Sequence, residues 1–400
     1  MDRSLASEGD IELKILNLRF QLNTIFSLVF FACSALALSG LLRDFLLGGN
    51  AWKQGDWLIN IDRTLVRRGP LGSAIIRVSD ILHTNPLVVV LTIQAVLFLT
   101  LVILTWNVVR RMEHPNAYWL LVLSPAFFTI FWAADTEGSM RKELIIYVSF
   151  VVFLTALLSA DYKRSLFNLS GALFLVGLIS HEANLFFVPI YLYCGLIAAR
   201  AGRLPNGLAR FWLPAVIVTS LFVVYFTLVY SRVEMADDVC LPLLERGLSS
   251  KICGGAIAWL TYDLDYAMSK TAAAFSSKKI VLLPVMFLLS SISLLVFAFQ
   301  TDKRLRTILQ LCLLAALFTP LYFIAVDFGR WINFYVSSFV FLVICSVLTD
   351  NLRMTKELSA GVLIACIGLA LILSPSHTRG FESALETPWN AYMAWQQLGH

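Results

Sequence analysis

Long apolar segments recur along the whole chain, and polar residues are confined to the stretches between them. A helix that crosses a bilayer needs about 20 mostly apolar residues, and on this criterion the pattern predicts about eleven spans. Their expected ranges are 24–47, 86–109, 118–134, 144–160, 166–180, 184–200, 211–230, 280–299, 307–325, 333–349 and 358–374. Two of them, 118–134 and 166–180, are short. We therefore expect their polar ends to lie below the membrane surface, inside protein or a wet cavity.

The polar stretches divide the chain into a leader, a bundle and a tail. Residues 1–23 are polar and lack a small-residue cleavage site, which is typical of a cytoplasmic leader before a retained first span. Residues 24–374 form the expected bundle, with long outer loops at 48–85 and 231–279. Residues 375–400 predict an outer interfacial tail, a helix with little chemistry. The predicted fold class is all-α, a polytopic transmembrane helical bundle.

Composition supports this class and excludes others. Of the 400 residues, 58% are hydrophobic and 14% are charged, whereas soluble domains have about 45–50% apolar and about 25% charged residues. The mean hydropathy is +0.77 over the whole length. The net charge of +5 suits the positive-inside bias of membrane proteins, and no basic tract predicts nucleic-acid binding. No phosphate-binding glycine loop is present, which argues against nucleotide-driven chemistry.

Lysine and arginine residues predict the orientation. They are concentrated beside the N-terminus and in compact loops between alternate spans, so we expect a cytoplasmic N-terminus, in a bacterial inner (plasma) membrane. Three segments on the expected outer side also carry basic residues: VRRGPLG, SMRKE and DFGRW. Charges kept at such positions are often functional. The alternative is that these side chains extend to outer lipid headgroups.

The first outer loop combines acids with two arginines. Asp56 and Asp62 precede Arg67 and Arg68, and a Gly-Pro turn follows. Apolar residues then recur at helical spacing, which predicts a short interfacial helix over 72–83. Such a loop could place a catalytic base beside a site for an anion. The alternative is a solvated loop with local ion pairs.

A second block lies between the third and fourth expected spans. It contains Asp135, Glu137, Arg141, Lys142 and Glu143. The two basic residues abut the start of a span, where a guanidinium and an ammonium group suit a phosphate. The acids would support them. The alternative is an ion-paired hairpin.

Two shorter blocks complete the candidate site. His181 and Glu182 lie in a tight turn and could perform acid–base chemistry or bind a metal, although HExxH is absent. They could equally be a structural pair at helix ends. Asp327 and Arg330 are either a structural pair or part of the anion site, with Trp331 at the membrane interface.

The second long loop contains two cysteines and several aromatic residues. Cys240 and Cys253 share this polar loop and could form a disulfide in an oxidising compartment. Trp259, Tyr262 and Tyr266 could form part of a lid. Aromatic side chains stack on sugars, but they are also ordinary interfacial anchors.

The layout resembles the C-type fold of membrane glycosyltransferases, which use polyprenyl-phosphate-linked sugars. Those proteins share many spans and a long first outer loop with an essential acid and an interfacial helix. The matching positions here are Asp56 or Asp62 and the helix near 72–83. The blocks VRRGPLG, RKE, HE and DFGRW also resemble those of bacterial membrane proteins from surface-polysaccharide loci. The adjacent acid pair of several such families is not present.

These observations predict a membrane glycosyltransferase that acts on the outer face. It would move a sugar from a polyprenyl-phosphate-linked donor to a glycan or lipid acceptor among the membrane lipids. A polysaccharide polymerase of another fold, an acyltransferase or a transporter of lipid-linked sugars are the alternatives. No cofactor is required, although Asp56, Asp62, Glu182 and Asp327 could hold a divalent cation with phosphate. The candidate catalytic residues are Asp56, Asp62, His181 and Glu182. The candidate phosphate-binding residues are Arg67, Arg68, Arg141, Lys142 and Arg330, supported by Asp135, Glu137, Glu143, Asp327 and Trp331.

Overall fold

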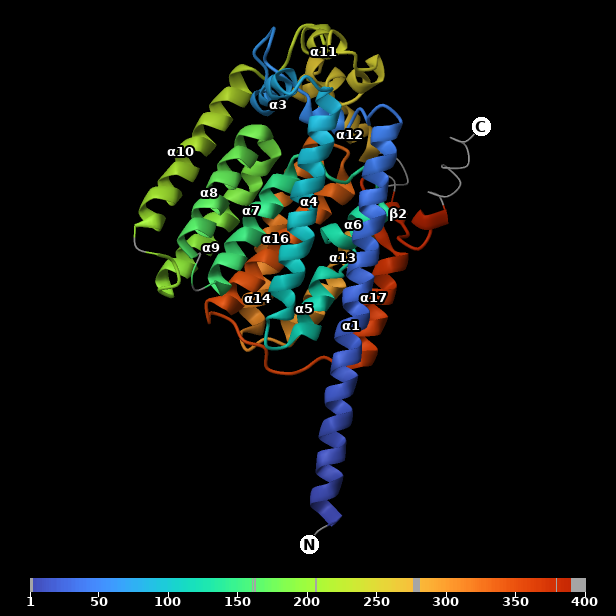
Figure 1. Ribbon diagram of the computed structural model, residues 1–400, viewed down its shortest axis with the longest axis vertical. Helices are drawn as coiled ribbons and strands as arrows, with labels where there is room; N and C mark the ends of the chain where they lie inside the picture. The colour runs from blue at the N-terminus through green and yellow to red at the C-terminus, as the bar shows by residue number, and fades with distance from the viewer. Residues whose placement is uncertain are drawn as a thin grey trace.

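A computed structural model describes residues 3–159, 161, 163–205, 207–275, 281–378 and 380–389, with side chains from residue 21 onward. Within these ranges the chain is all-α except for one small hairpin (Figure 1). Among the residues that the structure describes, seven helical segments are long and apolar enough to cross a membrane, as expected of an integral membrane protein. They are α1 (Arg3–Leu46), α4 (Pro86–Arg110), η1 with α9 (Glu182–Phe187 and Val188–Arg200), α10 (Leu208–Val229), α13 (Leu282–Phe299), α14 with α15 (Arg304–Phe318 and Leu321–Ile324) and α16 (Phe328–Leu348).

Four further segments match expected spans but fall outside this set. They are α5 with α6 (Pro115–Val122 and Phe128–Ala134), α7 (Glu143–Leu158), α8 (Lys163–Ser180) and α17 (Ala360–Ile372). Both α7 and α17 are apolar but shorter than the long helices. The total of about eleven spans therefore stays a prediction.

The remaining elements lie outside the long helices. They are α2 (Gln54–Trp57), α3 (Gly69–Ile81), α11 (Asp237–Leu244), η2 (Ser250–Gly254), η3 (Ala258–Thr261), α12 (Leu264–Phe275), β1 (Ser374–Ser376) and β2 (Gly380–Glu382). Elements α3, α11 and α12 gather at one end of the bundle, and the N-terminus lies at the other (Figure 1). The predicted helix over 72–83 is therefore present, but it begins and ends slightly earlier.

The loops expected on the cytoplasmic side meet one another. The Arg203 guanidinium lies 3.0 Å from the Asp350 carboxylate. The backbone N–H of Asp302 donates to the carbonyl of Arg353 at 3.0 Å. These contacts place the loops at 203, 302 and 350–353 together at one end of the bundle. Which end faces the cytoplasm stays a prediction.

The expected continuous helix over 118–134 is interrupted between α5 and α6. Pro125 lacks an N–H group and disfavours helical backbone at the residue before it. Buried carbonyls in the interruption need partners, since no water reaches them. The Asn333 amide donates to the Ala126 carbonyl at 2.7 Å, and the Ser374 hydroxyl donates to the Pro125 carbonyl at 2.8 Å. Side chains from two later segments thus stabilise the break.

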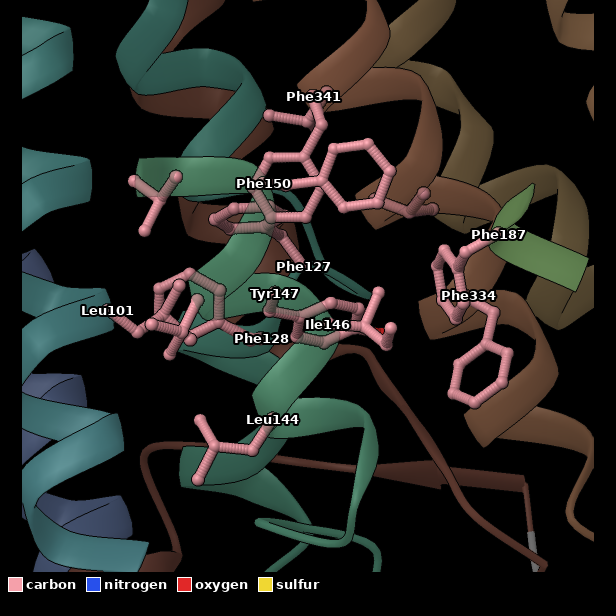
Figure 2. Packing of buried hydrophobic residues seen from close by; sticks show 14 of the residues in the cluster. Leu101, Phe127, Phe128, Leu144, Ile146, Tyr147, Phe150, Phe187, Phe334 and Phe341 are labelled. Carbon is pink, nitrogen blue, oxygen red and sulfur yellow. The ribbon is translucent and has the colours of Figure 1, made fainter. Parts of the chain in front are cut away.

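Helix α16 runs through the centre of the bundle. In its most apolar window, 89% of the residues are buried, against 11% for the peripheral α10. Aromatic rings fill the space between α16 and α7, with Phe341 stacked on Phe150 at 5.1 Å (Figure 2). The Tyr147 hydroxyl donates to Asn333 Oδ1 at 2.6 Å. This packing fixes α16, so the charged residues at its N-terminal end are held in place.

The two long loops are joined to each other. The predicted disulfide between Cys240 and Cys253 is present, with Cα atoms 5.8 Å apart. The backbone N–H of Ala256 donates to the Ala51 carbonyl at 3.1 Å, which links the second loop to the first. Gly72 packs so closely that an added Cβ would lie 1.9 Å from the Ile59 carbonyl oxygen. Only glycine therefore fits at position 72, where α3 packs against the backbone of Leu58 and Ile59 earlier in the same loop.

The described part of the tail differs from the expected interfacial helix. Strands β1 and β2 pair in an antiparallel hairpin that packs against α6, α13 and α16. The Gly329 N–H donates to the His377 carbonyl at 3.2 Å, and the Thr387 hydroxyl donates to the Ala133 carbonyl at 2.8 Å. The tail departs from the prediction because its serine and threonine hydroxyls complement buried carbonyls. Residues 390–400 lie outside the described residues.

Candidate active site

Asp56 lies at the centre of the charged residues that the outer blocks bring together. It belongs to the single turn of α2, which is fixed by buried polar contacts on either side. The Trp57 indole donates to the Met140 carbonyl at 3.1 Å, and the Gln54 amide donates to Gln94 Oε1 at 3.2 Å. Asp56 is 2% exposed. Neither of its carboxylate oxygens has a hydrogen-bond partner among the described residues.

The surrounding charges keep this carboxylate ionised. Burial acts to raise the pKa of Asp56, but nearby cationic side chains, Lys142 foremost and Arg68 among them, hold it below its ordinary value. The guanidinium of Arg68 lies 3.6 Å from Asp56 Oδ1. A buried, ionised carboxylate without a hydrogen-bond donor is unusual, because polar groups inside proteins are normally paired. Both oxygens are thus available to accept a proton from a ligand.

Arg67 and Arg68 converge on one carboxylate, that of Glu182. The Arg68 Nε donates to Glu182 Oε2 at 2.7 Å, and both its Nη2 and the Arg67 Nη1 donate to Oε1. Arg68 has a φ of +66°, in the left-handed region that non-glycine residues rarely adopt. Such strained backbone is found preferentially at functional sites. Glu182 therefore occupies the position in which two arginines would bind an anion.

Lys142 joins the same cluster from the segment before α7. Its side chain is fully buried, and its ammonium group donates to the Arg68 carbonyl at 3.0 Å. Burial lowers the pKa of Lys142 to about 8, against the opposing attraction of Asp56. The ammonium group therefore loses its charge in a pH range that an enzyme assay can cover.

His181 is buried beside Glu182, but the ring nitrogen nearest to Glu182 already accepts a hydrogen bond from the backbone. The Ala183 N–H donates to His181 Nδ1 at 3.0 Å, and the same nitrogen lies 3.7 Å from Glu182 Oε2. An accepting Nδ1 leaves the proton on Nε2 of the neutral ring. The pair thus has the capping geometry that the sequence left open, and Glu182 is the partner of the arginines.

A second group of charges surrounds the N-terminal end of α16. Arg330 donates to both oxygens of Glu143, at 3.1 and 2.7 Å, and to Asp327 Oδ2 at 3.1 Å. Arg141 donates to the same Asp327 oxygen at 3.1 Å. Burial acts to raise the pKa of Asp327, but Arg141 and Arg330 lower it to about 2. Arg330 is therefore engaged by carboxylates. Trp331 is buried, with its indole donating to the Ala325 carbonyl at 3.1 Å, and does not lie on the surface.

Asp135 has a partner that the sequence did not indicate. His377 Nδ1 lies 2.6 Å from Asp135 Oδ2, and the Gly138 N–H donates to Oδ1 at 2.9 Å. Burial acts to lower the pKa of His377, but the hydrogen bond and charge of Asp135 raise it above its ordinary value. Glu137 is largely exposed, with its carboxylate 3.7 Å from His377 Nε2. A lone histidine in a tail gives no sequence signal of this contact.

The positions of two further charged residues, Asp62 and Lys53, differ from what the sequence analysis indicated. Asp62 is exposed and accepts a hydrogen bond from the Ser73 hydroxyl at 2.6 Å, so the structure does not bring it to the other acids. Lys53, which the sequence analysis passed over, is fully buried with its ammonium 2.5 Å from Asp44 Oδ2. That ion pair anchors the first outer loop to the end of α1.

A small cavity reaches the charged cluster from the side of α10. Arg68 and Glu182 line one part of it, and Phe222 and Phe226 of α10 line another. No group of three or more His, Cys, Asp or Glu side chains suited to a metal occurs in the described part of the chain. Of the residues named for a divalent cation, Asp56 and Glu182 both lie beside Arg68, and Asp327 is paired with Arg141.

Comparison with known proteins adds no relative. No protein family, no curated protein and no solved structure matches the chain. The class that fold and site define is an integral membrane protein with a buried cluster of opposite charges at one end of its bundle. The resemblance to C-type glycosyltransferases stays a prediction.

Proposed function

We propose that the chain is a membrane glycosyltransferase. It moves a sugar from a polyprenyl-phosphate-linked donor to a glycan or lipid acceptor on the outer face of the membrane. The observation that carries this proposal is the Asp56 carboxylate, which is buried and ionised with neither oxygen hydrogen-bonded among the described residues. A general base must be charged at neutral pH and must have a lone pair free to accept the proton.

The proposed reaction is a displacement at the anomeric carbon of the donor sugar. The acceptor hydroxyl oxygen forms a bond to that carbon, and the bond from the carbon to the phosphate oxygen breaks. The electron pair leaves with the polyprenyl phosphate, and Asp56 takes the hydroxyl proton. Fixed positive charges near the leaving phosphate stabilise the negative charge that develops there. Arg68 and Lys142 supply such charges beside Asp56.

Arg67 and Arg68 bind the donor phosphate in this proposal. Both are paired with Glu182 in the described structure. In this proposal the phosphate displaces Glu182 from the Nη groups of Arg67 and Arg68 that it now occupies. In this proposal the lipid part of the donor lies in the cavity beside these arginines, against the apolar side chains of α10.

Turnover of a labelled donor tests the proposal. Purified protein in detergent is mixed with radiolabelled polyprenyl-phosphate sugar and a membrane extract as acceptor, and transferred label is counted. We expect Asp56→Asn to lower turnover by about 10²–10⁴, the usual contribution of a general base. Asp62→Asn is the matched control, because this exposed carboxylate lies in the same loop, and it should retain turnover. Undiminished transfer by Asp56→Asn would remove the proposed base.

One observation favours a second candidate, a transporter of lipid-linked sugars. Transporters often contain interrupted helices, and the break between α5 and α6 is of that kind. Its carbonyls are, however, occupied by Asn333 and Ser374, and the charged cluster lies elsewhere. Reconstituted vesicles distinguish the two candidates. A transporter moves the labelled lipid across the bilayer unchanged, whereas a transferase consumes it only when acceptor is present.

A further inference from the structure

The turn that carries Asp56 is held between the helical bundle and the second outer loop. On the bundle side, the Trp57 indole donates to the Met140 carbonyl at 3.1 Å. On the other side, the turn meets two short elements of the second loop, α11 and η2. The Asp56 carboxylate makes no hydrogen bond among the described residues. Its position therefore depends on what holds the turn.

Two backbone carbonyls of the second loop contact this segment, one before and one after Asp56 in the sequence. The Ile252 carbonyl packs against Gly55, where an added Cβ would lie 2.7 Å from the carbonyl oxygen. The Asn60 amide donates to the Val239 carbonyl at 2.8 Å, and both residues are fully buried. The segment from Gly55 to Asn60 is thus held at both of its ends.

The disulfide joins the two residues that directly follow these carbonyls. Cys240 comes after Val239 in α11, and Cys253 comes after Ile252 in η2. Cys240 is 4% exposed, so the bond lies inside the contact between the loops. A covalent link at these positions prevents α11 and η2 from separating, and it therefore keeps both carbonyls against the segment.

We infer that Cys240 and Cys253 are positioning residues for Asp56. Their disulfide holds the two carbonyl contacts in place, and the proposed base is correctly placed only while the pair is oxidised. A misplacement of about 1 Å in an active site can lower turnover by about 10². The catalytic consequence rests on the proposed function, whereas the placement of the turn is measurable without any substrate.

Hydrogen exchange of the purified protein, with neither donor nor acceptor present, tests the placement. The Leu58 N–H donates to the Gln54 carbonyl at 3.1 Å, so exchange over residues 54–60 reports opening of the turn. In the double variant Cys240→Ser with Cys253→Ser, we expect this peptide to exchange about tenfold faster than in wild type, as the loss of a buried contact predicts.

Two further variants separate the contact from general loosening of the loops. Asn60→Ala removes the Val239 contact while the disulfide stays intact, and it should speed exchange over residues 54–60 to a similar extent. Arg63→Met is the matched control. It removes an ion pair with Glu245 that also links the two loops, but both side chains are largely exposed, at 44% and 57%. Exposed pairs contribute little, so its exchange should match wild type.

Turnover of the labelled donor tests the catalytic consequence. The double serine variant and Asn60→Ala should each lower kcat by about 10², with an unchanged KM for the donor, since Arg67 and Arg68 are retained. Combining these changes should lower kcat little further, because they act through the same turn. A phosphine reductant should lower kcat of wild type equally and leave the double serine variant unaffected. It converts the disulfide to two thiols and becomes the phosphine oxide, with oxygen taken from water.

The pH profile of kcat distinguishes positioning from a purely structural role. Burial acts to raise the pKa of Asp56, and the nearby cationic side chains hold it below its ordinary value. Displacing the carboxylate from those cations raises its pKa, so the acid limb of the profile should move to higher pH in the double serine variant. A variant that only folded less completely would keep the profile of wild type.

Two results would overturn the inference. One is exchange over residues 54–60 at the wild-type rate in the double serine variant, and the other is an unaltered kcat in that variant. If Asp56→Asn keeps its turnover, the proposed function fails, but the exchange measurement still decides whether the disulfide positions the turn. The two proposals therefore fail separately.

Discussion

Replacing Arg330 by Met should destabilise the protein more than replacing its partner Glu143 by Gln. Both side chains are buried, at 3% and 0% exposure. Arg330→Met leaves the Glu143 carboxylate without either of its two donors inside the bundle. Breaking a buried ion pair in this way costs about 3–5 kcal/mol.

The opposite substitution has a smaller expected effect. Glu143→Gln keeps the shape and one acceptor oxygen, and Arg330 retains Asp327 at 3.1 Å. The expected cost is that of weakened hydrogen bonds to a charged group, about 1.5–3 kcal/mol. In the double variant Arg330→Met with Glu143→Gln no buried carboxylate is orphaned. It should therefore be more stable than Arg330→Met alone.

Unfolding of the purified protein measures the double-mutant cycle of Arg330 and Glu143. The free energy of unfolding of wild type, both single variants and the double variant is obtained from denaturant titration in one detergent, followed by tryptophan fluorescence. Arg203→Met is the control, because its partner Asp350 is exposed and such pairs contribute about 0–1 kcal/mol. Additive single effects, or an Arg330→Met cost no larger than that of Arg203→Met, would refute the buried pairing.

Three further outcomes follow from the site. Burial lowers the pKa of Lys142 to about 8, so turnover should fall as pH rises through 8, and Lys142→Met should be slow at every pH. Between pH 8 and the ordinary lysine value the unfolded chain binds more protons, so stability should rise with pH there, and a flat profile would contradict this. Replacing Cys240 and Cys253 by serine should destabilise the second loop by about 3 kcal/mol, seen as faster cleavage by added protease than in wild type. His377→Ala removes the imidazole partner of the buried Asp135, while the backbone N–H groups of residues 377 and 138 still donate to it; the loss of this charge-assisted hydrogen bond should lower the free energy of unfolding by about 1.5–3 kcal/mol, whereas an unchanged value would show the contact to be dispensable.

The sequence located most of the site because charged residues are rare in an apolar chain. Asp56, Arg68 and Lys142 stood out beside spans, and the alternation of loops placed them at one end. The two cysteines were likewise identifiable, since they share a polar loop and the other cysteines lie in apolar runs. These inferences depend only on composition and order along the chain.

Other features depend on contacts that order along the chain does not encode. His377 is separated from Asp135 by 242 positions, and nothing in its surroundings marks it. Glu182 was a candidate acid, but its role as the partner of two arginines depends on where α3 packs against α8. The interruption at Pro125 could be suspected from the proline alone. That it is filled by Asn333 and Ser374 could not.

The large separations between partners also bear on how the protein is made. Glu143 precedes its partner Arg330 by 187 positions, and Pro125 precedes Ser374, the donor to its carbonyl, by 249 positions. Ribosomal synthesis proceeds from the N-terminus, so Glu143 and Pro125 are synthesised before the residues that pair with them. The final hairpin completes the structure only after nearly all of the chain has been synthesised. A chain that ended before this hairpin would lack Ser374 and Thr387, which donate to the buried Pro125 and Ala133 carbonyls.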